Sequence, residues 1–478
     1  MNIYLKNYWS IYREFLETFE NLTFKDIPLC LMTNFYQHID QSLQTKMEED
    51  TFPLSDKYPE MKYEMIQPYF DKWLNKGNLT LTTKLKNGKL LINSDYTRIP
   101  ATCYRTLFDP EKTIILSRSN AEKVNGIPNE TMKKYEENTE DISNRLIKIA
   151  KSIFRKLDNH PAFSNEFFQE TFLNRIPLIV RTISAGHNLF QAHKISVIIV
   201  GTTEDIVSRT LAIVGRRYGI KSICLQHGIL MGEEAFLPVF TKKVAVYGEY
   251  EKNWYLKRGL TPDRISEIGH PKYDQIFTRT TEKNRSLFDK FKLDTNKITL
   301  LVITGPNMDP ERFTKLIENL IKDSRYQLII KPHPWEIGKQ KCQLYFDLEK
   351  KYESIKVWTI RGGNLYELID QVDGVIGTLS TAILESILLK KPVFIFNFIF
   401  SNRTYGYYDQ FGKHIQTDPN QLYAIIDKYY TVPEQKQDFE MTRDRFLGTL
   451  YLDGNSGQKL LFECCQNEDS SVANTPEK

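Results

Sequence analysis

The sequence predicts an α/β protein of two domains, each built around a parallel β-sheet. The chain has 478 residues, more than a single hydrophobic core usually supports. Short apolar runs alternate with amphipathic segments in two series, at 197–268 and 298–396, and such alternation is typical of βαβ units. A polar, charged stretch at 278–297 separates the two series and reads as a linker.

These observations set the expected domain boundaries. We expect an N-terminal α/β domain with helical additions at 1–278, a linker at 279–297 and a second α/β domain at 298–440. A helical segment at 441–466 could return to the first domain. The tail at 467–478 is polar, and we expect it to be disordered.

The first 195 residues predict a less regular start. Aromatic residues recur at helical spacing within 1–24, and the interleaved Glu14, Glu17 and Glu20 favour burial of this stripe over a docking surface for a membrane. A strand is expected at 26–32. The pair Asn87-Gly88 predicts a hairpin over 83–93.

The two regular series predict the elements of the sheets. In the first series, strands are expected at 197–200, 222–225, 243–247 and 264–268, with helices at 205–218 and 249–258. In the second, strands are expected at 298–304, 328–330, 356–359, 374–376 and 393–396, with helices at 311–323, 339–351 and 364–372.

Composition argues against several classes of protein. The 64 basic and 60 acidic residues are too balanced for a nucleic-acid-binding chain, and no apolar run is long enough to span a membrane. The N-terminus lacks the apolar core of a signal peptide. The six cysteines and eight histidines show neither disulfide nor metal-ligand spacing, so we expect a cytoplasmic, reduced protein without a metal site.

Lysine and histidine follow the strand expected at 328–330, in the sequence Lys331-Pro332-His333-Pro334. In an open parallel sheet, ligands bind beyond the carboxyl ends of the strands. The prolines stiffen the backbone around the imidazole, and the lysine offers a point charge that suits phosphate. A histidine that merely caps a neighbouring turn is the alternative. The pattern favours an anion site, and a diphosphate fits it best.

A second polar cluster, Thr378-Leu379-Ser380-Thr381, opens the helix that follows strand 374–376. Ser380 and Thr381 would present hydroxyls and backbone N–H groups to an anion, although an ordinary N-cap explains them equally well. Glu385 lies four residues after Thr381, on nearly the same helix face, where its carboxylate could accept from two ribose hydroxyls. Gly305 follows strand 298–304 and would let the backbone approach phosphate.

The order of these motifs resembles the sugar-nucleotide half of GT-B glycosyltransferases. It is most similar to the branch of CDP-glycerol glycerophosphotransferases, polysialyltransferases and capsule-polysaccharide transferases. Those enzymes carry His-Pro after one strand, a Ser-Thr or Ser-Ser pair before a helix with an acidic residue, and Lys/Arg-Pro before the next strand. The counterparts here are His333-Pro334, Ser380-Thr381 with Glu385, and Lys391-Pro392, within a resemblance that spans roughly residues 195–397.

The resemblance implies a GT-B-like fold, in which two Rossmann-like domains face each other across a cleft. The second domain would bind the nucleotide and the first the acceptor, with His333 contacting the phosphate or ribose of the donor. The donor-binding residues expected are Gly305, Lys331, His333, Pro334, Thr378, Ser380, Thr381 and Glu385.

The first domain offers a candidate catalytic base in Gln226-His227-Gly228, which closes strand 222–225. Inverting transfer needs a base for the acceptor hydroxyl, and histidine titrates near neutral pH. Related polysaccharide transferases show a similar QHG element, although a histidine that only shapes the turn is the alternative. His270-Pro271 repeats the His-Pro pattern and is expected to line the cleft with Gln226 and Gly228. Rival bases are Glu204, Asp205, Glu233 and Glu234.

We therefore expect a metal-independent, inverting glycosyltransferase. It would move a sugar or polyol phosphate from a CMP-, CDP- or UDP-linked donor to a hydroxyl of a surface glycan or lipid-linked acceptor, with no further cofactor. Peripheral association with the inner face of the membrane stays open. Two alternatives remain: a non-hydrolysing UDP-sugar 2-epimerase, whose usual Asp-Ser-Gly-Gly loop here reads Gly377-Thr378-Leu379-Ser380, and a non-catalytic nucleotide-sugar-binding protein.

Overall fold

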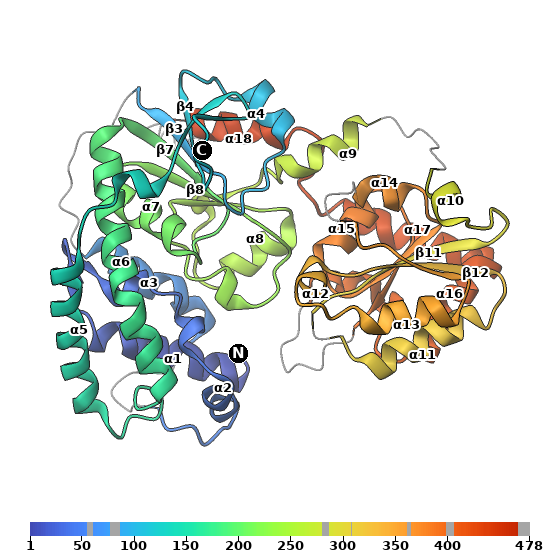
Figure 1. The fold of residues 1–478 in the computed structure, drawn as a ribbon, viewed down its shortest axis with the longest axis horizontal. Helices are drawn as coiled ribbons and strands as arrows, with labels where there is room; N and C mark the ends of the chain where they lie inside the picture. The colour runs from blue at the N-terminus through green and yellow to red at the C-terminus, as the bar shows by residue number, and fades with distance from the viewer. Residues whose placement is uncertain are drawn as a thin grey trace, which may run out of the picture. The chain divides into compact units, whose positions relative to one another are not determined.

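The computed structural model describes residues 1–54, 61–76, 87–279, 286–306, 308–360, 365–397 and 406–466. The chain divides into two compact units (Figure 1). The first comprises Met1–His227, Met231–Asp274 and the described part of Tyr451–Lys478. The second comprises Gly228–Leu230 and Gln275–Leu450.

The first unit is built around an eight-stranded sheet of order β10-β9-β8-β7-β3-β4-β6-β5. Neighbouring strands are parallel except for β5 and β6, which pair antiparallel. The strands are β3 (Lys89–Asn93), β4 (Thr113–Leu116), β5 (Lys123–Val124), β6 (Ile127–Glu130), β7 (Ile195–Val200), β8 (Lys221–Leu225), β9 (Lys243–Ala245) and β10 (Ile265–Ser266). The strands predicted in the first series are therefore confirmed.

The predicted hairpin at 83–93 is wrong in its second half. Both edges of β3 are occupied by parallel partners, β4 on one side and β7 on the other, so no edge is left for a hairpin strand. Residues 83–86 lie outside the described part of the chain. Residues 26–32 also differ from the predicted strand. Lys25 and Asp26 both have positive φ in a tight turn between β1 (Thr23–Phe24) and β2 (Ile27–Pro28), and a buried 3-10 helix follows at Leu29–Met32.

Helix α1 (Ile3–Thr18) buries its aromatic stripe, which confirms the prediction for 1–24. Tyr8, Trp9, Tyr12 and Phe15 are all buried, and the rings of Tyr12 and Phe35 stack at 4.4 Å. Other helices of the first unit are α2 (Gln41–Met47), α3 (Ile66–Asn75), α4 (Ala101–Leu107), α5 (Glu140–Phe154), α6 (Glu166–Ala192), α7 (Ile206–Arg217) and α8 (Glu249–Leu256).

The last helix, α18 (Ser456–Cys465), packs in the first unit against α4, although about 350 residues separate them in the sequence (Figure 1). The Asp274 carboxylate accepts from the backbone N–H groups of Ser456 at 3.0 Å and Gly457 at 2.7 Å, and so caps the start of α18. Near the other end, Lys221 and Lys243 both form ion pairs with Glu463. These contacts join the C-terminal helix to strands β8 and β9.

The second unit contains a parallel six-stranded sheet of order β13-β12-β11-β14-β15-β16. Its strands are β11 (Ile298–Ile303), β12 (Tyr326–Lys331), β13 (Ile355–Val357), β14 (Gly374–Gly377), β15 (Val393–Phe396) and β16 (Ile415–Gln416). Its helices are α10 (Ser286–Phe291), α11 (Pro310–Ile321), α12 (Pro334–Gly338), α13 (Gln343–Lys351), α14 (Leu365–Asp370), α15 (Thr381–Leu388), α16 (Pro419–Thr431) and α17 (Pro433–Leu447), while α9 (Asp274–Thr278) joins the units.

Two stretches of the second unit differ from their predicted structure. The helix predicted at 339–351 is present as α13 but begins four residues later, at Gln343, because Gln340 has a φ of 55°. Helix α10 occupies part of the stretch predicted as a linker. Across the described residues, none of the helices combines the length and apolarity that a bilayer crossing requires.

Candidate functional site

Three loops of the second unit leave the sheet at the same edge. The strand order β12-β11-β14 and the register Lys331–Ile303–Gly377 place their carboxyl ends side by side. The loop after β11 carries Gly305, the loop after β12 carries the Pro332–Pro334 turn, and the loop after β14 carries Thr378–Ser380. This edge is where an open parallel sheet binds its ligand.

His333 is the N-cap of α12, so the capping role considered from the sequence is present. Its Nδ1 accepts from the backbone N–H of Trp335 at 3.2 Å, and the backbone N–H of His333 donates to the Glu336 carboxylate at 2.8 Å. Because Nδ1 accepts, the neutral ring carries its proton on Nε2, which stays available as a donor. Partial desolvation of the imidazole lowers its pKa; the charge of Glu336 opposes this shift, and that of Lys331 adds to it.

Glu336, which the sequence analysis missed, organises this loop from beneath. Its buried carboxylate accepts from the hydroxyls of Thr304 and Tyr345 in addition to the His333 N–H. It therefore links the loop after β11 to the loop after β12. The signal in the sequence is an acid three residues after the cap residue, which is capping-box spacing.

Ser380 occupies the N-cap position of α15, but its hydroxyl makes no capping hydrogen bond. The hydroxyl oxygens of Ser380 and Thr378 are both buried and have no hydrogen-bond partner among the described residues, whereas buried hydroxyls are normally paired. The Tyr408 hydroxyl donates to the Ser380 carbonyl at 2.7 Å and holds the loop. A Cβ added at Gly305 would lie 3.1 Å from the Thr378 methyl group, so the absence of a side chain there lets the two loops approach. An ordinary cap does not account for Ser380.

Glu385 and Lys331 lie close enough for their charges to interact. Burial lowers the pKa of Lys331, and the Glu385 carboxylate opposes that shift. Glu385 is only 4% exposed, so its carboxylate is buried in this structure. Thr381 is the first residue of α15 and is half-buried.

Lys391 has a structural role, because its ammonium donates to the carbonyls of Asp370 and Val372 at 2.8 and 2.7 Å, at the end of α14.

His227 follows β8 in the first unit and lies between two aromatic rings. Phe236 stacks on it, with ring centroids 5.0 Å apart, and Tyr96 meets it edge-on at 6.4 Å. Desolvation and the positive charge of Arg98 lower its pKa to about 4, while a hydrogen bond with the Gly201 backbone works against them. The expectation of a pKa near neutrality is therefore wrong for the free protein. His227 is neutral at physiological pH, which is the form a base requires.

Three of the four rival bases, Glu233, Glu204 and Asp205, have structural partners on the neighbouring elements. Glu233 is buried, forms an ion pair with Arg258 and accepts from Trp9 Nε1 at 3.0 Å. Glu204 accepts from Asn34 Nδ2 at 2.8 Å. Asp205 caps α7 through the backbone N–H groups of residues 207 and 208, both at 3.0 Å. This geometry does not favour any of the three as the base.

Gln226 and His270 support the site from within the unit. Gln226 Nε2 donates to Glu251 at 2.9 Å, and the Tyr247 hydroxyl donates to the Gln226 carbonyl at 2.8 Å. His270 is buried, and its Nδ1 accepts from the backbone N–H of Lys272 at 2.9 Å. Both residues act as supports, and Gly228 is buried in the turn after His227.

A small cavity opens beside His227 within the first unit. It is lined by side chains from the ends of β7 and β8 and from the segment before β9, namely Thr202, Thr203, Cys224, Gln226, His227, Ala235, Phe236, Val239, Thr241, Val244, Ala245 and Tyr255. Polar and apolar groups are mixed in this wall. No group of three His, Cys, Asp or Glu side chains suited to a metal ion occurs in the described ranges of the chain.

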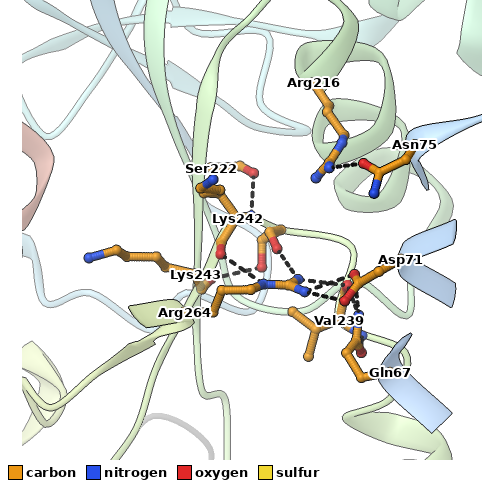
Figure 2. Close-up of polar contacts among 10 residues, drawn as sticks. Gln67, Asp71, Asn75, Arg216, Ser222, Val239, Lys242, Lys243 and Arg264 are labelled. Atoms are coloured by element: carbon orange, nitrogen blue, oxygen red, sulfur yellow. Dashed lines mark hydrogen bonds and ion pairs between the residues drawn. The ribbon is translucent and has the colours of Figure 1, made fainter. Parts of the chain in front are cut away.

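The cavity wall at 239–242 is held by polar contacts with α3 (Figure 2). Gln67 and Val239 exchange two hydrogen bonds, with Gln67 Nε2 donating to the Val239 carbonyl at 3.0 Å and the Val239 N–H donating to Gln67 Oε1 at 2.9 Å. Arg264 reaches both Asp71 carboxylate oxygens at 2.8 Å and the Thr241 carbonyl at 2.9 Å. This cluster fixes the segment that follows Phe236.

Comparison with known proteins agrees with the architecture. Residues 241–403 match the family model of capsule polysaccharide biosynthesis proteins. The fold is similar to the UDP-bound MnaA of S. aureus, with 12% identity and a TM-score of 0.52 over 78% of this chain and 95% of that chain. It is also similar to a putative UDP-N-acetylglucosamine 2-epimerase from Listeria monocytogenes, with 12% identity and a TM-score of 0.50 over 79% and 95%. A search of curated proteins finds no match. The predicted α/β, GT-B-like fold with two Rossmann-like domains is confirmed.

Proposed function

We propose that this chain is a glycosyltransferase that takes a sugar, or a polyol phosphate, from a nucleotide-activated donor. The observation that carries the proposal is the pair of buried, unpartnered hydroxyls of Thr378 and Ser380 at the strand edge that also carries Lys331 and His333. Buried hydroxyls without partners are costly unless a ligand uses them. The match of residues 241–403 to capsule polysaccharide biosynthesis proteins supports a role in surface-polysaccharide synthesis.

The donor's diphosphate has several sources of positive potential in this proposal. Lys331 supplies a charge, His333 supplies its Nε2–H, and the start of α15 supplies backbone N–H groups. Such groups stabilise the negative charge that develops on the leaving nucleotide. A metal ion is then not required, and the proposed transfer is metal-independent. Binding of the ribose by Glu385 stays a prediction.

His227 is proposed as the base that removes the proton of the acceptor hydroxyl. Its neutral ring can accept a proton, and its aromatic neighbours Tyr96 and Phe236 fix its plane. With a sugar donor, the deprotonated hydroxyl attacks the anomeric carbon from the face opposite the nucleotide, so the bond from that carbon to the nucleotide's phosphate oxygen breaks as the new glycosidic bond forms, and the centre is inverted. With a polyol phosphate donor, the hydroxyl attacks phosphorus and the bond from that phosphorus to the nucleotide breaks. The acceptor proposed is a hydroxyl of a glycan or lipid-linked glycan.

Calorimetry on the full chain with CMP, CDP, UDP and GDP tests the donor site, with and without EDTA. We expect one of these nucleotides to bind most tightly, and EDTA to leave its affinity unchanged. Failure of all four nucleotides to bind would overturn the proposal. Incubation with UDP-N-acetylglucosamine alone tests the epimerase alternative, because an epimerase needs no acceptor. A nucleotide-binding protein whose His227→Ala variant matches wild type in transfer assays would instead be non-catalytic.

A further inference from the structure

The loop after β3 contains two exposed side chains in an uncommon backbone conformation. Tyr96 and Arg98 have φ values of 64° and 51°, in the left-handed region that non-glycine residues rarely adopt, and Tyr96 is 49% exposed. Neither residue is Gly, Asn or Asp, so local preference does not explain the loop. Such conformations persist where the surrounding structure imposes them, and they cluster at functional sites.

The surroundings of this loop do impose its shape. Asn93 is buried and donates to the Ser208 hydroxyl at 2.9 Å, while the Thr97 hydroxyl donates to the Ser94 carbonyl at 3.1 Å. The loop also packs directly on the backbone of Gly201, where an added Cβ would lie 2.2 Å from the Tyr96 carbonyl carbon. The conformation of residues 94–98 is therefore fixed by β7 and α7.

This fixed loop places a free cation beside the proposed base. Tyr96 meets the His227 ring at 6.4 Å, and the charge of Arg98 acts on both His227 and His270. Asp95, the nearest acid in the sequence, is already paired with Arg118 at 2.8 Å. Over the part of the chain that the structure describes, Arg98 forms no hydrogen bond or ion pair.

We propose that Arg98 binds a carboxylate or phosphate of the acceptor, next to the hydroxyl that His227 deprotonates. This inference rests on the proposed glycosyl transfer and narrows its acceptor to an anionic one. A guanidinium binds either anion through two parallel hydrogen bonds, which fixes position as well as affinity. The exposed Tyr96 ring beside it offers an apolar face to a sugar ring.

Occupation of Arg98 has a consequence for the base. The anion neutralises the charge that helps to keep His227 unprotonated, so a bound acceptor raises the pKa of His227 from about 4 and strengthens it as a base. The charged and titratable groups acting on His227 are Arg98, on the loop after β3, and His270, after β10. The carboxylates of Glu204, Glu233 and Glu251 on the adjoining elements are taken up by Asn34, Arg258 and Gln226.

The test follows the His227 imidazole by NMR titration of the full chain, assigned with His227→Gln. Probes are glucuronate against glucose, and glycerol phosphate against glycerol, and these two pairs distinguish a carboxylate from a phosphate ligand. We expect one anionic probe, and neither neutral one, to raise the His227 pKa in wild type. In Arg98→Gln the pKa is raised without any probe, and the probe binds roughly ten- to a hundredfold more weakly.

Arg105→Gln is the matched control, because it removes one exposed arginine from α4 in the same unit. It should leave both the His227 pKa and the probe response unchanged. Equal responses of wild type and Arg98→Gln to the anionic probes would overturn the inference, as would the absence of any response in wild type. Nucleotide affinity, measured separately, should be unchanged in Arg98→Gln. If the wild-type protein binds no nucleotide but still shows the anion response, the proposed function is overturned and the anion site is kept.

Discussion

Removal of the Ser380 hydroxyl distinguishes two possible roles of this group, binding of a ligand and capping of helix α15. A working serine or aspartate N-cap contributes roughly 1 kcal/mol to stability. The Ser380 hydroxyl makes no hydrogen bond, so Ser380→Ala should change the free energy of unfolding by far less than that. If the hydroxyl donates to a charged phosphate oxygen, its loss should cost about 1.5–3 kcal/mol of binding, or roughly ten- to a hundredfold in dissociation constant. Thr378→Val, which removes the other unpartnered hydroxyl, should behave alike.

Asp418→Ala provides the opposite pattern within the same unit. Asp418 caps α16 by accepting from the backbone N–H groups of Asn420 at 2.9 Å and Gln421 at 2.8 Å. Its loss should cost about 1 kcal/mol of stability and leave nucleotide affinity unchanged. The assay pairs urea unfolding with calorimetry of the cognate nucleotide for all three variants. A Ser380→Ala variant as destabilised as Asp418→Ala, with wild-type affinity, would refute the assignment of this hydroxyl to a ligand.

Three further outcomes are expected. Glu233→Gln should destabilise the first unit by roughly 3 kcal/mol, because it breaks a buried ion pair with Arg258. If Glu233→Gln instead unfolds like wild type and its turnover is reduced a hundredfold, Glu233 is the catalytic base. Gln67→Leu should cost about 1–3 kcal/mol, because it leaves the buried Val239 N–H unpaired, while the Val239 carbonyl keeps its hydrogen bond from Arg264. Asn75→Ala, on the exposed end of the same helix, should be nearly neutral, and equal effects of the two variants on urea unfolding would contradict this. Burial lowers the pKa of His38 from 6.5 to about 3, so below pH 6.5 the unfolded chain binds more protons than the folded one, and stability falls as the pH drops from 6.5 towards 3. His38→Gln should reduce this loss of stability. An unchanged dependence of stability on acid pH would exclude His38 as its source.

The sequence predicted what depends on local pattern. Alternating apolar runs located the strands of both sheets, and the polar residues after β8, β12 and β14 were expected at strand ends. Contacts between distant residues could not be read in this way. Glu233 looked like a base because its partners, Arg258 and Trp9, lie 25 and 224 residues away. The same limit applies to the low pKa of His227, which comes from burial and from a charge on another strand's loop.

Positive φ values are the second kind of feature that sequence pattern missed. Residues 94–98 contain no glycine to announce a left-handed turn, and the shape of the loop is set by its contacts with Gly201, Ser208 and Leu116. The turn at Gln340 differs, because it is a local end of α12, where the N–H of Lys341 donates to the Glu336 carbonyl at 2.9 Å. At 94–98 tertiary contacts therefore decide the backbone. Asn-Gly pairs are local turn signals, and one of them, Asn125-Gly126, joins β5 to β6 with φ values of 52° and 87°.

The return of α18 to the first unit affects the order in which the chain can fold during synthesis. Leu460 belongs to the same apolar cluster as Ile223, Leu225 and Ala245, which come from β8 and β9. Ribosomes add roughly 5–20 residues per second, so the surface around these strands emerges roughly 10–40 s before the helix that covers it. During that interval the second unit is made and can fold as an insertion. The first unit completes its fold last, when Asp274 contacts the start of α18 and Glu463, near the end of α18, pairs with Lys221. Until then the apolar surface that α18 covers is accessible to chaperones.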